Sequence, residues 1–265
     1  MYILLDIGGT NTRIAISQTG ETLDEIIKVP TSVDFDGAMN AIDAVIKEKT
    51  KGVIDSVYVG VAGPLDVARS MVINAPNLPL WNGKPLRKKL EAITGASVTL
   101  ENDCVLAGVG EAQFGAGRGF PIVVYMTVST GVGGARIVYG MPEVSRYGFE
   151  PGHQIISIDG EKFSLEQLVS GTAIEKRYGK KPEDIEDPVI WEQIATDLAV
   201  GLNNTLVYWS PDIIILGGSV MKKISLDVLK EKIKEIVFIF PELPKIEKAS
   251  LDESVLWGAL AMVKR

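Results

Sequence analysis

Cysteine and histidine are almost absent from this 265-residue chain, which contains only Cys104 and His153 of these two types. A disulfide within the chain is excluded, because it would need a second cysteine. A structural zinc site normally needs more cysteine and histidine ligands than these two. Nucleophilic catalysis with a histidine base would have to use His153. The sequence is therefore neither a disulfide scaffold nor a zinc module.

An excess of positive charge and long apolar runs are also missing. The chain has 27 Lys and Arg against 34 Asp and Glu, a formal net charge of −7, whereas nucleic-acid binding favours a basic surface. No apolar run approaches the ~18 residues of a membrane-spanning helix. The N-terminus shows no signal-peptide pattern. With 46% hydrophobic residues, we expect a globular cytoplasmic protein with neither nucleic-acid nor membrane partners.

Two segments share the order strand, glycine-rich turn, strand. The first covers residues 2–16 with its turn at 8–12, and the second covers 121–138 with its turn at 129–134. This echo is typical of an internal duplication. The chain length admits two domains of roughly 100–200 residues each. Because helical periodicity alternates with these strands, the sequence predicts two related α/β domains.

The glycine-rich turns are suited to binding an anion. Neither opens a helix, which argues against a Rossmann site, and no Walker A pattern is present. Consecutive glycines let backbone N–H groups approach a phosphate, and threonine hydroxyls add donors. Asp6 precedes the first turn and could face a phosphate-bound Mg²⁺. Each turn alone also fits an ordinary hairpin, but two in corresponding places favour a polyphosphate ligand.

These segments resemble the ROK family of sugar kinases and repressors, within the actin-like ATPase superfamily. The matching residues follow family order along nearly the whole chain, at 6–10, 101–103, 130–134, 150–153, 165–171 and 216–218. The Glu-Pro-Gly-His segment at 150–153 is more specific than the glycine turns. The resemblance implies an α/β fold of two actin-like (ribonuclease H-like) domains with a cleft between them. The first would contain residues 1–117 and 251–265, and the second residues 118–250.

Asn102 and Asp103 stand where a predicted strand meets a predicted helix. A carboxylate at a helix N-terminus tends to stay ionised, so it can accept a proton from an attacking alcohol. An N-cap aspartate is the ordinary interpretation of this position, and the two roles are compatible. The resemblance implies that Asp103 is the general base and Asn102 a ligand of a sugar hydroxyl.

Glu150 and His153 place a carboxylate and an imidazole at one Pro-Gly turn, a combination that suits vicinal hydroxyls. The resemblance implies that both contact the sugar, together with Glu166 and the backbone of Gly63. Family members usually carry cysteines between this histidine and this glutamate, where zinc is bound with the histidine. Residues 154–164 contain no cysteine. We therefore expect no structural zinc, and how this segment is held stays open.

The resemblance also implies that ATP with Mg²⁺ is the phosphate donor. Asp6 would hold the Mg²⁺, through water. The expected nucleotide ligands are Gly8, Gly9, Thr10, Thr12, Thr130, Gly131, Gly133, Gly217 and Gly218.

The sequence thus predicts an ATP-dependent kinase that phosphorylates the primary hydroxyl of a hexose, glucokinase-like in the first place. A polyphosphate-dependent glucokinase, a fructokinase and an N-acetylhexosamine kinase remain alternatives, because no motif fixes the sugar or the donor. A sugar-responsive transcriptional regulator is more remote, since no helix-turn-helix precedes the first strand and the isoelectric point is about 5.0. The expected partners are a sugar and a nucleotide. Homodimers are common in the family, but no motif sets the oligomeric state.

Overall fold

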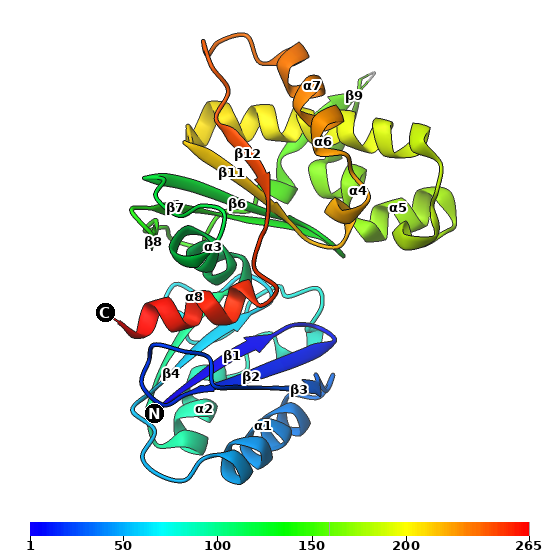
Figure 1. Ribbon diagram of the computed structural model, residues 1–265. Coiled ribbons are helices and arrows are strands. Elements are labelled where there is room, and N and C mark those ends of the chain that lie inside the picture. The colour runs from blue at the N-terminus through cyan, green and yellow to red at the C-terminus, as the bar shows by residue number, and fades with distance from the viewer. Residues whose placement is uncertain (159, 265) are drawn as a thin grey trace. The chain divides into compact units, whose positions relative to one another are not determined.

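The computed structural model describes residues 1–158 and 160–264, and the chain divides into two compact units (Figure 1). The first unit contains Met1–Gln113, Val144–Gly148 and the C-terminal segment from Leu251. The second contains Phe114–Glu143 and Phe149–Ser250. The structure assigns the segment Val144–Gly148 to the first unit, whereas the sequence-based division placed it in the second. The domain boundaries at 117/118 and 250/251 stay a prediction.

The first unit is built on a five-stranded sheet in the order β3-β2-β1-β4-β5. Strands β1, β4 and β5 run parallel, while β2 and β3 run antiparallel to their neighbours. The carboxyl ends of the three parallel strands therefore meet at one edge, where α/β proteins commonly bind ligands. The strands are β1 (Tyr2–Ile7), β2 (Asn11–Ser17), β3 (Glu25–Pro30), β4 (Ser56–Val61) and β5 (Ser97–Asn102).

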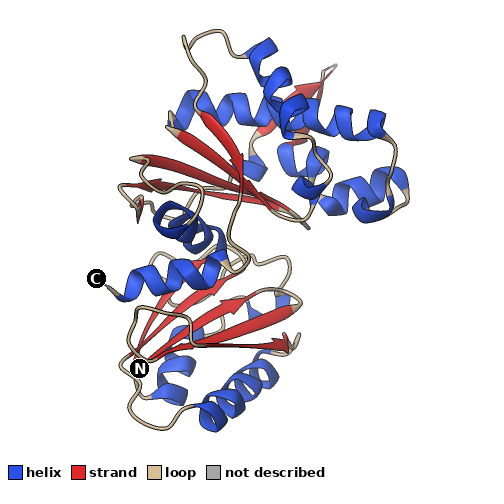
Figure 2. Cartoon of the chain, in the orientation of Figure 1, coloured by secondary structure: helices blue, strands red, loops and turns tan. Residues whose placement is uncertain are grey.

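Helices cover both faces of this first sheet (Figure 2). Successive side chains of β1 alternate: Ile3 and Leu5 join the core under α1 and α2, whereas Leu4 joins the core under α3 and α8. Asp34 caps α1 by accepting from the Gly37 N–H at 2.7 Å. The helices are α1 (Phe35–Lys49), α2 (Leu86–Thr94), α3 (Asp103–Phe114) and α8 (Ser254–Val263), with a 3-10 turn at Pro79–Trp81.

The second unit carries a sheet of the same design, in the order β12-β11-β6-β7-β8. Strands β6 and β7 form an antiparallel hairpin, and β11 and β12 extend the sheet in parallel from β6. A separate hairpin joins β9 to β10. The strands are β6 (Ile122–Val128), β7 (Val132–Val138), β8 (Met141–Pro142), β9 (Ile155–Ile158), β10 (Glu161–Ser164), β11 (Ile213–Gly217) and β12 (Lys245–Lys248).

The long helix α6 forms the centre of the second unit's core. It starts with Asp187 as N-cap and Pro188 in its first turn, and it ends at Ser210 in the left-handed conformation. Its buried face includes Trp191 and Leu198. The helices are α4 (Leu165–Val169), α5 (Gly171–Tyr178), α6 (Pro188–Trp209) and α7 (Leu226–Ile236), with 3-10 turns at Pro151–His153, Pro182–Asp184 and Val220–Lys222.

The two sheets match strand for strand, which agrees with the echo seen in the sequence. In each, a hairpin of two antiparallel strands surrounds a glycine-rich turn, and two further strands extend the first hairpin strand in parallel. The predicted α/β class is confirmed. Among residues 1–158 and 160–264, no helix is both long and apolar enough to cross a membrane.

Candidate active site

The edge at the carboxyl ends of β4 and β5 brings together Gly63, Asn102 and Asp103. The Asn102 Nδ2 donates to the carbonyl oxygen of Gly63 at 3.1 Å. The Asn102 Oδ1 accepts from the backbone N–H of Cys104 at 2.9 Å and from that of Val105 at 3.4 Å. Asn102 is thus the N-cap of α3, and it joins this helix to the loop after β4. Its predicted contact with a sugar hydroxyl stays a prediction.

Asp103 occupies the first position of α3. Its Oδ1 accepts from the Cys104 N–H at 2.8 Å, and the residue is half-buried. The positive end of the helix dipole favours the ionised carboxylate at this position. An ionised, partly exposed carboxylate at a sheet edge can accept a proton from an approaching alcohol.

Asp6 lies near the end of β1 and is only 8% exposed. Its Oδ2 accepts from Arg13 Nη1 at 3.0 Å, and Arg13 Nε lies 2.9 Å from Glu253 Oε2. Burial raises the pKa of Asp6 to about 6, against the lowering effect of Arg13. Arg13 therefore does not fully offset the cost of burying the ionised Asp6 carboxylate, and a hard divalent cation nearby would favour the ionised form. This donor chemistry fits the predicted role of Asp6 toward Mg²⁺.

The first glycine turn forms a tight hairpin loop. The Gly8 N–H donates to the Asn11 carbonyl at 3.0 Å. A Cβ on Gly9 would lie 2.7 Å from the Asn77 Cβ, so only glycine fits there. Thr10 is exposed, as a phosphate ligand must be. Thr12 is buried, and its Oγ1 lies 2.9 Å from the Thr31 Oγ1. The Thr12 hydroxyl is therefore not exposed on the surface of the turn.

The second glycine turn lies beside the third in the second unit. Ser129 Oγ and Ser219 Oγ are 3.2 Å apart, which joins the loop after β6 to the turn after β11. Gly218 has a φ of +94°, and a Cβ there would lie 2.2 Å from the Val128 carbonyl oxygen. The Thr130 carbonyl accepts from the Thr172 hydroxyl at 2.9 Å, so the loop is also tied to α5. The structure thus groups the predicted ligands of residues 130–133 and 217–218.

Glu150, His153 and Glu166 share one neighbourhood of the second unit. The pKa of Glu150 is raised by partial burial of its carboxyl, lowered by the charge of His153, and raised by that of Glu166. The Glu166 Oε2 accepts from the Val132 N–H at 2.8 Å. A Cβ on Gly131 would lie 2.6 Å from the same oxygen. The predicted sugar ligands therefore adjoin the second glycine turn.

Comparison with known proteins identifies the family. The model described as "ROK family" matches residues 2–265. The chain belongs to the ROK family. Along 98% of its length it is 27% identical to a glucokinase of Thermotoga maritima, covering 96% of that protein. It is also 27% identical to an N-acetyl-D-glucosamine kinase of Escherichia fergusonii, with 94% of each chain covered.

A solved structure confirms the fold. The ROK family glucokinase from Streptomyces griseus, in complex with glucose and AMPPNP, is 27% identical to this chain. The two superpose with a TM-score of 0.81, with 98% of each chain covered. The α/β architecture of the actin-like ATPases is therefore the fold of this ROK protein.

Sequence reasoning missed an ion pair next to the predicted base. The guanidinium of Arg69 pairs with the carboxylate of Glu101, which is 9% exposed and directly precedes Asn102. Glu101 Oε1 also accepts from the Asn102 backbone N–H at 2.9 Å. Burial raises the pKa of Glu101, while the Asn102 N–H and Arg69 lower it. No spacing signal connects Arg69 to Glu101, because their contact depends on a folded loop.

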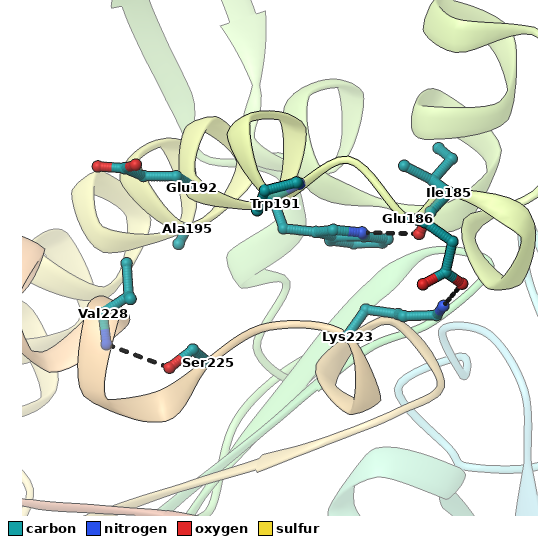
Figure 3. Close-up of a pocket in the computed structure, with 9 residues that line it drawn as sticks. Ile185, Glu186, Trp191, Glu192, Ala195, Lys223, Ser225 and Val228 are labelled. Atoms are coloured by element: carbon teal, nitrogen blue, oxygen red, sulfur yellow. Dashed lines mark hydrogen bonds and ion pairs between the residues drawn. The ribbon is translucent and has the colours of Figure 1, made fainter.

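A pocket of about 380 Å³ in the second unit also lies outside the predicted residues. Figure 3 shows its lining side chains at the start of α6 and the start of α7, among them the Trp191 indole. The indole N–H donates to the Ile185 carbonyl at 3.0 Å, and Lys223 pairs with Glu186 at 2.8 Å. The indole N–H of Trp191 and the charges of Lys223 and Glu186 are therefore already paired within the protein.

Residues 1–158 and 160–264 contain no group of three or more His, Cys, Asp and Glu side chains that could hold a metal ion. The expectation that this ROK protein lacks structural zinc remains a prediction for metal analysis of the purified protein.

Proposed function

We propose that this ROK-family sugar kinase transfers the γ-phosphoryl group of ATP to the primary hydroxyl of a hexose, with glucose as the preferred acceptor. The observation that carries the proposal is the grouping of Glu150, His153 and Glu166 beside the second glycine turn. Carboxylates and an imidazole suit vicinal hydroxyls, and the adjoining loop suits a phosphate. The glucokinase and N-acetyl-D-glucosamine kinase relatives support a sugar acceptor, and the AMPPNP complex supports ATP.

In the proposed reaction Asp103 accepts the proton of the sugar hydroxyl as its oxygen attacks phosphorus. The positive end of the α3 dipole favours the ionised form of this carboxylate, and the Asn102 cap fixes the helix start. Asn102 and the backbone of Gly63 hold sugar hydroxyls on the first unit. Glu150, His153 and Glu166 do so on the second.

The glycine turns bind the phosphates of the donor through backbone N–H groups. Thr10 and Thr130 are exposed at these turns and add hydroxyl donors. Asp6 holds Mg²⁺, through water. When bound, Mg²⁺ offsets charge on the phosphate oxygens. The expected cytoplasmic location stays a prediction from the sequence, and the oligomeric state stays open.

A panel of hexoses with either ATP or polyphosphate tests the proposal. Glucose, fructose, mannose and N-acetylhexosamines are each assayed for ADP release and for sugar-phosphate formation. We expect the highest kcat/KM with glucose and ATP. Phosphorylation only with polyphosphate would contradict the donor assignment, and a higher kcat/KM for another sugar would contradict the acceptor. ADP release without sugar phosphate would mean transfer to water and would contradict a sugar acceptor.

A further inference from the structure

Gln154 directly follows the 3-10 turn Pro151–His153 and forms hydrogen bonds with three different elements. Its side-chain Nε2 donates to the Pro151 carbonyl oxygen at 2.9 Å. Its Oε1 accepts from Asn204 Nδ2, on helix α6, at 2.8 Å. Its backbone carbonyl accepts from the N–H of Leu165, the first residue of α4, at 3.0 Å. One residue thus connects the turn to two helices.

The turn has few bonds of its own. The His153 N–H donates to the Glu150 carbonyl at 3.0 Å, and the Gln154 N–H donates to the Pro151 carbonyl at 3.3 Å. Short 3-10 segments have poor hydrogen-bond geometry, so contacts from outside are needed to fix their orientation. Strand β7 supports one side: a Cβ on Gly152 would lie 2.2 Å from the Val132 carbonyl oxygen. Gln154 supports the side toward α6.

Helix α6 provides a fixed base for this second support. A Cβ on Gly201 would lie 2.5 Å from a Leu165 side-chain carbon, so α6 and the start of α4 pack closely. Asn204 is three residues beyond Gly201, on the neighbouring position of the same helix surface. The side chain of Asn204 is half-buried, which restricts its motion. The Asn204 amide therefore reaches Gln154 from a helix that packs against the start of α4.

The same connection includes the third predicted sugar ligand. Leu165, bonded to Gln154, directly precedes Glu166. Glu166 in turn accepts from the Val132 N–H at 2.8 Å. The relative placement of the 150–153 turn and Glu166 therefore depends on the bonds that meet at Gln154. Binding groups must be held to within about 0.5 Å to work together.

We propose that Gln154 and Asn204 are a positioning pair that holds the 150–153 turn in the orientation required for sugar binding. The inference rests on the proposed function, in which Glu150 and His153 contact the sugar. Both members are neutral amides, which hold the turn without placing a further charge beside Glu150, His153 and Glu166. The pair acts through the turn and does not itself touch the sugar.

Two single variants and their combination test the pair. Gln154→Met keeps the length of the side chain but removes both of its side-chain hydrogen bonds. Asn204→Ala removes the other partner and favours the helix. We expect Asn204→Ala to raise the KM for the sugar about five- to tenfold, the effect of one lost hydrogen bond, and Gln154→Met, which loses two, to raise it at least as much. The kcat and the KM for ATP should change less than about twofold.

The combined variant should raise the sugar KM about as much as Gln154→Met alone, because Asn204 acts only through Gln154. Gln193→Ala is the matched control. Gln193 is an amide on the same helix that donates to Asp197 Oδ1 at 3.0 Å, about three turns of α6 before Asn204. Its sugar KM should stay at the wild-type value. A purely structural effect would lower the active fraction, and hence kcat, in all variants alike.

An unchanged sugar KM in folded Gln154→Met and Asn204→Ala would overturn the inference, as would fully multiplicative effects in the combined variant. Thermal melts establish folding, and Gln154→Glu is a second variant at this position. Its carboxylate would face the Pro151 carbonyl without a donor, so its sugar KM should also rise.

A Glu150→Gln variant distinguishes a failure of the positioning pair from a failure of the proposed sugar site. If Glu150→Gln raises the sugar KM and the amide variants do not, only the positioning pair is wrong; if it has no effect, the proposed sugar site is wrong.

Discussion

At the scale of single residues, the position of Asp103 depends on its neighbours. Asn102 caps α3 and reaches Gly63, while the Glu101–Arg69 pair fixes the Asn102 backbone. The sequence placed Asn102 and Asp103 at a strand–helix junction, because the strand pattern ends there. It did not decide which side chain caps the helix, since asparagine and aspartate are about equally good N-caps.

Replacing Asp103 by asparagine tests its role as general base. Asp103→Asn retains the size and the hydrogen bond to Cys104 but cannot accept a proton. We expect kcat to fall by about 10²- to 10⁴-fold, with sugar affinity within a few-fold of wild type. Asp36→Asn, at an aspartate in the first turn of α1, is the control and should keep full activity. Steady-state kinetics and calorimetric sugar titration provide the readouts, and near-normal turnover in Asp103→Asn would refute the assignment.

Asp197 predicts a pH dependence of stability. Its side chain is 8% exposed, and burial raises its pKa above the ordinary 3.8, despite hydrogen bonds from Gln193 and the charge of Arg177. Between the ordinary and the raised pKa, the folded protein binds more protons than the unfolded one. The contribution of Asp197 to stability therefore falls as the pH rises through this window. Above it, ionised Asp197 is a net cost.

Asp197→Asn should remove this dependence. At pH 7 the variant should be at least as stable as wild type, and its advantage should shrink as the pH falls toward 4. Urea unfolding at several pH values measures the difference in unfolding free energy. An advantage that grows toward low pH would show that the sign is wrong.

At the scale of elements, the contact between α3 and α8 depends on two glycines. A Cβ on Gly258 would lie 1.8 Å from the Leu106 carbonyl oxygen, and one on Gly110 would lie 2.2 Å from that of Ser254. The strand–helix junction at Asn102 and Asp103 predicted the start of α3. The sequence pattern did not reveal that α3 and α8 pack backbone to backbone, because the two segments lie far apart in the chain.

Gly258→Ala tests this close approach. The added methyl group meets backbone that cannot rotate away, so the helices must separate, at about 3 kcal/mol of unfolding free energy. Gly37→Ala in α1 is the matched control. Its Cβ would meet the Ser32 Oγ at 3.0 Å and the Asp34 Oδ2 at 3.2 Å, both side-chain atoms rather than backbone, and alanine favours a helix. Denaturant unfolding of both variants decides: a Gly258→Ala variant as stable as wild type would contradict the packing.

At the scale of the whole molecule, the chain repeats one design in two units. Each has a hairpin around a glycine turn and two parallel strands beyond it. The echo between residues 2–16 and 121–138 was visible in the sequence. The excursion of Val144–Gly148 to the first unit was not, because five residues carry no periodic signal.

Metal removal tests the prediction that no zinc supports the fold. Treatment with EDTA should leave the thermal midpoint unchanged, since hydrogen bonds at Gln154 hold the 150–153 turn. Activity should cease and return with Mg²⁺, because the donor needs it. Elemental analysis of the untreated protein is the control. One tightly held zinc per chain, or a lower midpoint after EDTA, would refute the prediction.

The sequence by itself determined the fold class, the duplicated hairpins and the candidate ligands, because these depend on local periodicity and on motifs of adjacent residues. Only the tertiary structure decided which distant side chains meet. Arg69 forms an ion pair with Glu101, Asn204 donates a hydrogen bond to Gln154, and Thr12 is buried. Such contacts join positions separated by tens of residues, and they arise only when sheets and helices pack. For that reason the groups that carry the proposed chemistry could be found in the sequence, while the groups that hold them in place could not.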